Sequence, residues 1–169
     1  MNIKYKGGDN LSKKAKTNAC RMLDQKKIPY IIREYYDSDA LSGKDVANFF
    51  GEDEKKVFKT LVLQGKSGEH YVMIIPSSNK IDLKKAAKSV NEKSVSMILQ
   101  KDLEPLTGYE HGGCSPIGMK KVFTTIIQKQ AFDYDTIYIS GGRIGLQLEI
   151  DPNELQKIIK IKSGDVIEN

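Results

Sequence analysis

Residues 57–76 of the chain read VFKTLVLQ-GKSG-EHYVMIIP. Two runs that favour strands, 57–64 and 69–76, flank a four-residue loop with glycine at its first and last positions. This pattern is typical of a β-hairpin. Because the two strands of a hairpin are antiparallel, a regular alternation of parallel strands and helices is not expected around it.

Helical patterns occur on both sides of this hairpin. Apolar residues recur every three or four positions over residues 12–27, which predicts an amphipathic helix with Ser12 as its N-cap. Ser42 and Asp45 indicate the start of a second helix, which Gly51 ends. Two further helices are expected, one after Asp82 and one over residues 152–158.

Short β-prone segments account for much of the remaining chain. They are residues 30–35, 94–98, 122–127, 136–140 and 146–150. Strands therefore outnumber helices without alternating with them, which predicts an α+β fold with a mixed, curved, barrel-like β-sheet surrounded by helices. For 169 residues we expect a single domain, residues 12–169, after a flexible N-terminal segment, residues 1–11.

Charge, hydrophobic patterning and residue content limit the classes of protein to which this chain could belong. The net charge of +5 is compatible with a polyanionic partner such as nucleic acid, and equally with a lysine-rich domain that binds none. The apolar runs are of strand length and no signal-peptide pattern is present, so no membrane span and a cytoplasmic location are expected. Two cysteines and two histidines without metal-ligand spacing predict no disulfide and no metal. No Walker or dinucleotide-binding motif occurs, so no cofactor is expected.

Two glycine-rich loops are candidates for chemistry. Residues 112–118, GGCSPIG, hold three glycines and one proline, which can form a rigid cradle of backbone N–H donors for a carbonyl oxygen or a phosphate. The alternative is a tight turn between two strands. Residues 140–145, SGGRIG, form a second sharp loop or a β-turn with a bulge.

Two side chains near these motifs could take part in chemistry. Lys59 lies inside the first hairpin strand, and its side chain either faces solvent or holds an anionic or carbonyl oxygen at the mouth of a cleft. Cys114 lies inside the first glycine loop, where it either acts as a nucleophile or lines the loop. His111 is the histidine that could approach this thiol.

Four segments, in this order, carry a family resemblance. They are FKTL at 58–61, DLKKAAK at 82–88, TGY at 107–109 with GGCSPIG at 112–118, and YISGGRIG at 138–145. In this respect the chain resembles the YbaK/EbsC proteins, which are similar to the editing domain of bacterial prolyl-tRNA synthetases. The resemblance covers residues 16–167 and implies a free-standing aminoacyl-tRNA deacylase.

The resemblance also implies a substrate and a mechanism. The expected reaction is removal of cysteine from mischarged Cys-tRNA(Pro) or from Cys-tRNA(Cys), by attack of the substrate's own thiol on its ester carbonyl. The alternatives are a deacylase that activates water to cleave Ala-tRNA(Pro) or another small aminoacyl-tRNA, and a non-catalytic module that binds tRNA or a synthetase. The implied partners are the aminoacyl end of tRNA and prolyl-tRNA synthetase, and the expected oligomeric state is a monomer.

Site residues are carried over from the same segments. Lys59 would hold the 3′ end of the substrate, and Gly112 and Gly113 would orient the scissile carbonyl. The remaining substrate-binding residues implied by the resemblance are Tyr35, Thr60, Ser115, Pro116, Ser140, Gly141 and Gly142. The sequence departs from the family at Gln147, where several relatives have an acidic residue, and at Cys114, where an aliphatic residue is usual.

Overall fold

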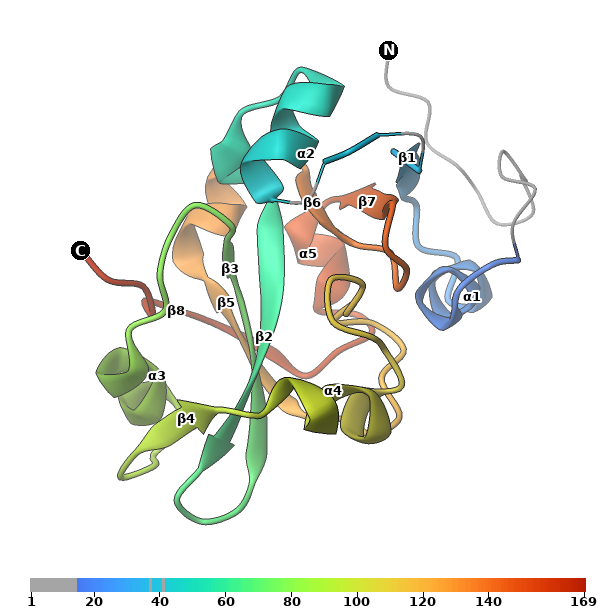
Figure 1. Cartoon of the computed structure of the whole chain (residues 1–169). Helices are drawn as coiled ribbons and strands as arrows, with labels where there is room; N and C mark the ends of the chain where they lie inside the picture. The colour runs from blue at the N-terminus through green and yellow to red at the C-terminus, as the bar shows by residue number, and fades with distance from the viewer. Residues whose placement is uncertain (1–14, 37, 41) are drawn as a thin grey trace.

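The computed structural model describes residues 15–36, 38–40 and 42–169, and its ribbon is drawn in Figure 1. The helices are α1 (Asn18–Gln25), α2 (Gly43–Phe50), α3 (Leu83–Ser89), α4 (Gln100–Thr107) and α5 (Pro152–Leu155), with short 3-10 turns η1 (Glu54–Lys56) and η2 (Lys129–Asp133). The strands are β1 (Ile31–Glu34), β2 (Phe58–Gly65), β3 (His70–Pro76), β4 (Val95–Met97), β5 (Thr124–Gln128), β6 (Ile137–Ser140), β7 (Leu146–Ile150) and β8 (Ile161–Gly164). None of the described helices is long and apolar enough to cross a membrane.

The strands form two sheets. A five-stranded sheet has the order β4-β2-β3-β5-β8, and a three-stranded sheet has the order β1-β7-β6. The predicted hairpin is confirmed as the antiparallel pair β2–β3, in which Lys59 is opposite Ile75. Because β5 and β8 add to it in parallel, the larger sheet is mixed, as expected.

The expectation of one barrel-like sheet is wrong. The two sheets meet at β2 and β6 through the isolated bridge between Val57 and Tyr138, and the strands do not close into a barrel. One bridge cannot continue a ladder, so the sheets remain separate and their inner faces enclose a core. The α+β class itself is confirmed.

Several element boundaries differ from the prediction. Helix α1 begins after Thr17, whose hydroxyl accepts a hydrogen bond from the Cys20 N–H, so the predicted start at Ser12 is wrong. Ser12 and the proposed segment of residues 1–11 lie outside the described residues. Helix α5 ends at Leu155, short of residue 158. The sequence pattern missed α4, which contains Pro105, and the four-residue strand β8.

Apolar side chains pack on both faces of the larger sheet. Phe58 and Val62 of β2 belong to the main core between the two sheets, which also includes buried residues of α1, β6 and β7. Leu63, on the other face, packs with Ala86 and Ala87 of α3. This alternation follows from the two-residue period of a strand, and it places Lys59 on the same face as Leu63.

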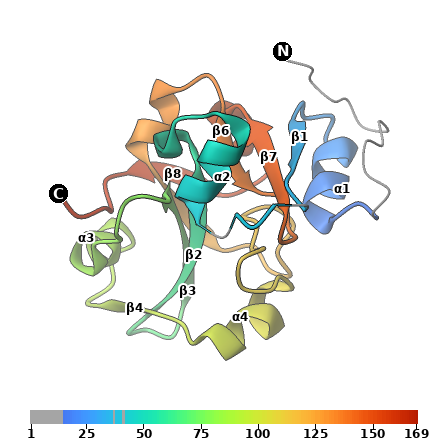
Figure 2. The ribbon, with the colours of Figure 1, turned by 45° about the horizontal axis from the view of Figure 1, so that its top comes forward.

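Strand β2 is paired along only part of one edge. Strand β4 pairs with residues 63–65, and the last contact of this ladder is a hydrogen bond from the Ile98 N–H to the Val62 carbonyl. At the other end, the isolated bridge to β6 is made by Val57, the residue before β2. Between these points the edge of β2 is not covered by a described strand. Helix α2 packs at the Val57 end through Val46 and Ala47, and Figure 2 shows this helix beside the upper end of β2.

Tyr109 holds the two glycine loops against each other. Its hydroxyl donates a 2.6 Å hydrogen bond to the Ile117 carbonyl in the first loop. In the second loop, Gly142 has φ 97°, and a Cβ there would lie 2.7 Å from the Tyr109 ring. Tyr109 is itself only 5% exposed. Glycine is therefore required at 142 by both its backbone conformation and the close approach of this ring.

Replacing Tyr109 by Phe tests this contact. The variant leaves the Ile117 carbonyl without its donor in a buried position, so we expect the free energy of unfolding to fall by about 1–2 kcal/mol. Urea denaturation measures the difference. Tyr71→Phe is the matched control, because the Tyr71 hydroxyl donates to the carboxylate of Glu92 at the surface, where water can replace it. An equal loss for both variants would contradict the proposed importance of burial.

Candidate functional site

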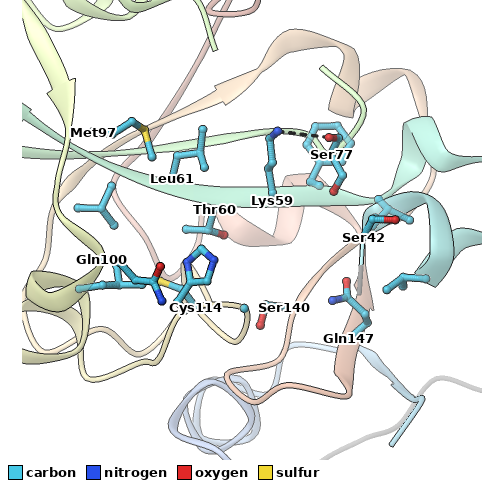
Figure 3. A pocket seen from close by; sticks show the side chains of 18 of the residues that line it. Ser42, Lys59, Thr60, Leu61, Ser77, Met97, Gln100, Cys114, Ser140 and Gln147 are labelled. Carbon is cyan, nitrogen blue, oxygen red and sulfur yellow. Dashed lines mark hydrogen bonds between the residues drawn. The ribbon is translucent and has the colours of Figure 1, made fainter. Parts of the chain in front are cut away.

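A cleft of about 470 Å³ lies along the open edge of β2. Its walls come from β2, the start of α2, the segment joining β4 to α4, and both glycine loops (Figure 3). The lining residues are Tyr35, Ser42, Gly43, Val46, Val57, Phe58, Lys59, Thr60, Leu61, Val62, Ser77, Met97, Ile98, Leu99, Gln100, Leu103, His111, Gly112, Cys114, Ser140 and Gln147. The cleft thus brings together segments that are more than a hundred residues apart in sequence.

The two ends of the cleft differ in polarity. Leu61 and Met97 lie at one end, whereas Ser42 and Gln147 lie at the other (Figure 3). Leu99 extends the apolar end and is 61% exposed. A large apolar side chain so exposed beside a cleft is suited to contact a flat apolar surface of a ligand.

Lys59 carries the positive charge of the cleft and lies between these two ends (Figure 3). Its side chain is half-buried, and Nζ donates a 3.3 Å hydrogen bond to the Ser77 carbonyl. Among the described lining residues there is no aspartate or glutamate to pair with it. Desolvation by burial lowers the pKa of Lys59. The lysine therefore lies in a cleft wall with Nζ turned toward Ser77 (Figure 3) and without a carboxylate partner among the described lining residues.

The first glycine loop contributes only part of its length to the cleft. Gly112 and Cys114 line it, whereas Gly113 packs against the second loop, where a Cβ would lie 2.9 Å from the Ile144 backbone nitrogen. Ser115 is fully buried, and its hydroxyl accepts a hydrogen bond from the Ile117 N–H. Pro116 lines a different hollow. The loop joins α4 to β5, so it is not the turn between two strands considered as the alternative.

The second loop joins β6 to β7 and also contributes one residue to the cleft. Ser140 lines the cleft, and its hydroxyl accepts a 3.2 Å hydrogen bond from the Gly142 N–H. The Gly141 carbonyl accepts a hydrogen bond from the Thr17 hydroxyl, which connects the loop to the start of α1. Gly141 and Gly142 therefore shape the loop without lining the cleft. Tyr35 and Thr60 do line it.

Several lining residues were not among the predicted site residues. Ser77 follows β3 and is brought to Lys59 by the hairpin, and the apolar end comes from the segment before α4. Gln147 belongs to β7, in which all five residues are buried. Gln147 is a polar residue between two leucines of this buried strand, and this local pattern could have indicated a site residue.

The thiol of Cys114 is not set up for nucleophilic attack. The side chain is buried, and desolvation raises its pKa to about 11, so that it is protonated near neutral pH. His111 lines the same cleft, but the side chain that the Cys114 thiol hydrogen-bonds is Thr107. Within the described part of the chain, no group of three His, Cys, Asp or Glu side chains could hold a metal ion.

Comparison with known proteins gives a consistent family. The model of the aminoacyl-tRNA editing domain matches residues 37–158. EbsC of Enterococcus faecalis, a candidate Cys-tRNA(Pro)/Cys-tRNA(Cys) deacylase, is 43% identical over 154 residues, which cover 90% of this chain and 92% of that protein. The proline–tRNA ligase of Fervidobacterium nodosum is 22% identical over 84% of this chain and 28% of its own length.

Solved structures show the same fold at low sequence identity. A candidate trans-editing enzyme for prolyl-tRNA synthetase superposes with a TM-score of 0.76 at 22% identity and covers 83% of this chain and 87% of its own. A hypothetical protein superposes with a TM-score of 0.81 at 19% identity and covers 90% of this chain and 100% of its own.

Alkylation of Cys114 tests its protonation state. A pKa about two units above the ordinary value of 9.0 leaves roughly a hundredfold less thiolate at pH 8 than in an unfolded chain. In a Cys20→Ala background, which removes the other thiol, we expect iodoacetamide to react at least that much more slowly with the folded protein than with the protein in urea. Similar rates in the two states would contradict a buried, protonated thiol.

Proposed function

The chain belongs to the aminoacyl-tRNA editing domain family, and we propose that it is a free-standing deacylase that releases cysteine from mischarged Cys-tRNA(Pro), with Cys-tRNA(Cys) as a second substrate. Such an activity has a physical purpose. Cysteine and proline are close in size, so a synthetase pocket separates them poorly and a second sieve is required.

The observation that supports this proposal best is that Lys59, whose Nζ bonds only a backbone carbonyl, lies in a cleft without a described carboxylate. An ester carbonyl is neutral in the ground state and develops negative charge on its oxygen when a nucleophile attacks. A lysine cation and the backbone N–H of Gly112, which lines the cleft, can stabilise that charge more strongly than they stabilise the ester, whereas the Gly113 N–H already donates to the Glu110 carbonyl. This arrangement favours acyl transfer rather than binding alone.

The chemistry of the cleft also favours a nucleophile from the substrate. The Cys114 thiol is protonated, and the described lining residues include no carboxylate that could act as a general base on water. We propose that the substrate thiol attacks its own carbonyl carbon. A C–S bond forms, the C–O bond to the ribose breaks, and the ribose oxygen takes the thiol proton, which releases a cyclic thiolactone and free tRNA. Such an intramolecular attack has an effective molarity on the order of 10⁵ M or more when well oriented.

The two ends of the cleft suggest how the substrate lies. We propose that the terminal nucleoside of tRNA lies against Leu61, Met97 and Leu99, because an adenine base has large apolar faces. Lys59 then lies beside the ester, and the amino acid extends toward Ser42, Ser140 and Gln147 (Figure 3). The cleft therefore holds an aminoacyl-nucleoside and leaves the rest of the tRNA outside.

Selection of the tRNA then requires a partner. A cleft that holds only the aminoacyl end has no means to read an anticodon, so we propose that a complex with prolyl-tRNA synthetase supplies it. The editing enzyme itself is proposed to act as a monomer. The cytoplasmic location and the domain limits of residues 12–169 stay predictions.

Release of free tRNA from a panel of substrates tests the activity. We expect rapid loss of the cysteinyl ester from Cys-tRNA(Pro), and little loss from Ala-, Ser- or Pro-tRNA(Pro), because these lack the thiol. Lys59→Ala should lower kcat/KM by about 100-fold or more, since it removes charge stabilisation in the transition state. Lys66→Ala, an exposed lysine in the β2–β3 turn, is the matched control and should retain activity.

The same panel separates the alternatives. Turnover of Ala-tRNA(Pro) would replace the thiol mechanism by one that activates water. Rapid turnover of Ser-tRNA(Pro) would contradict thiol assistance directly. Failure of every substrate would leave a module that binds tRNA or a synthetase.

The alkaline limb of the pH profile tests the charge on Lys59. Because burial lowers its pKa, we expect kcat/KM, after subtraction of the uncatalysed rate, to fall at a lower pH than for an exposed lysine. In Lys59→Arg this fall should disappear, since arginine stays charged. Titration of Lys59 does not itself favour unfolding, because a lysine whose folded pKa is lowered contributes stability that increases as pH rises through that pKa. An unchanged limb in Lys59→Arg would show that another group titrates.

A further inference from the structure

Gln147 has an unusual buried oxygen. Its side chain is 93% buried. Among the buried side-chain nitrogen and oxygen atoms of the described residues, Gln147 Oε1 is the one without a hydrogen-bond partner. Such an atom has lost its water without gaining a donor, which destabilises the folded state. A native structure retains this kind of group mainly where function requires it.

The register of the smaller sheet directs this side chain into the cleft. Gln147 is opposite Ser140 on β6, and both residues line the polar end of the cleft (Figure 3). On the other side it is opposite Arg33 of β1, whose guanidinium donates to the carboxylate of Glu149 instead. The flanking strands therefore place donors nearby without using one to satisfy Gln147.

A second buried glutamine shows that the chain can satisfy such a side chain. Gln128, at the end of β5, is fully buried. Its Nε2 donates to Gln130 and Asp165 at 2.6 and 2.9 Å, and its Oε1 accepts from the Val166 N–H at 2.8 Å. The two glutamines differ in that Gln147 lines a cleft. Its unpaired oxygen is therefore best explained by a ligand that supplies the missing donor.

We infer that Gln147 Oε1 accepts a hydrogen bond from the α-amino group of the aminoacyl ester, an inference that rests on the proposed function. The amino group is one carbon away from the ester carbonyl and is the donor that every aminoacyl-tRNA shares. It enters the polar end when the nucleoside lies at the apolar end. A neutral acceptor suffices there, and it leaves the charge of Lys59 uncancelled. The contact makes a free amino group a requirement for rapid cleavage.

The test compares two enzymes on two substrates. One substrate is Cys-tRNA(Pro), and the other is 3-mercaptopropionyl-tRNA(Pro), which keeps the thiol and the ester but lacks the amino group. Wild type should prefer the cysteinyl ester by about tenfold or more in kcat/KM, the expected size of one hydrogen bond to a buried group. Gln147→Met, which has nearly the same shape, should lose about that factor on the cysteinyl ester and bring the ratio of the two substrates close to one.

The melting temperature distinguishes a binding role of Gln147 from a structural one, because loss of a structural hydrogen bond would lower it. Gln147→Met removes an unpaired buried oxygen, so its melting temperature should equal or exceed that of wild type. Gln128→Met, the matched control, breaks satisfied hydrogen bonds outside the cleft. It should lower the melting temperature while the substrate ratio stays that of wild type.

Each outcome decides the inference. A substrate ratio in Gln147→Met equal to that of wild type would overturn it and leave the deacylase activity intact. A loss of melting temperature as large as that of Gln128→Met would assign Gln147 a structural role. A wild-type protein inactive on Cys-tRNA(Pro) would overturn the proposed function, and this inference with it.

Discussion

The incomplete pairing of β2 is the constraint on which the site depends. Because β4 pairs only with residues 63–65 and the bridge to β6 is made only by Val57, the strand edge between them is not paired with a described strand. Lys59 and Thr60 lie in that gap, so a cleft forms where a regular sheet would have continued. The backbone of β2 is nonetheless held in place, since β3 pairs with residues 58–64. A fixed strand with an open edge can thus position a lysine without closing the site.

Some glycines of the two loops allow close packing, and another lines the cleft. Gly113 and Gly142 are required because neighbouring backbone and the Tyr109 ring approach too closely for a side chain. Gly112 alone among the loop glycines lines the cleft. The GGCSPIG and SGGRIG motifs therefore specify mainly how one loop fits against the other. The packing of the two loops positions one residue of each in the cleft, Gly112 from the first loop and Ser140 from the second.

Local signals allowed the sequence to predict most elements, whereas the site required long-range pairing. The Ser42–Asp45 capping box begins α2 and the left-handed Gly51 ends it, as their chemistry predicts. The hairpin has its expected two strands, although Gly65 belongs to β2 and not to the predicted four-residue loop. Helix α4 was missed because Pro105 is a helix breaker in a local pattern, although here it is accommodated in the second half of the helix. The separation into two sheets depends on strand order, which periodicity does not encode, whereas Ser77 meets Lys59 through the hairpin itself. Gln147 shows the same limit, because its unpaired oxygen exists only in the folded sheet.

The cleft holds two groups that the fold would be more stable without. Burial lowers the pKa of Lys59 because its cation is partly desolvated and no described carboxylate pairs with it. Gln147 Oε1 lacks a donor in the same cleft. Pairing the two groups with carboxylate and donor side chains would stabilise the free protein, but it would also cancel the attraction that each has for an ester. The Lys59 cation and Gln147 Oε1 are both complementary to an aminoacyl ester whose carbonyl oxygen becomes negative. The free energy that these two groups cost the free protein is therefore regained as interaction with the reacting substrate.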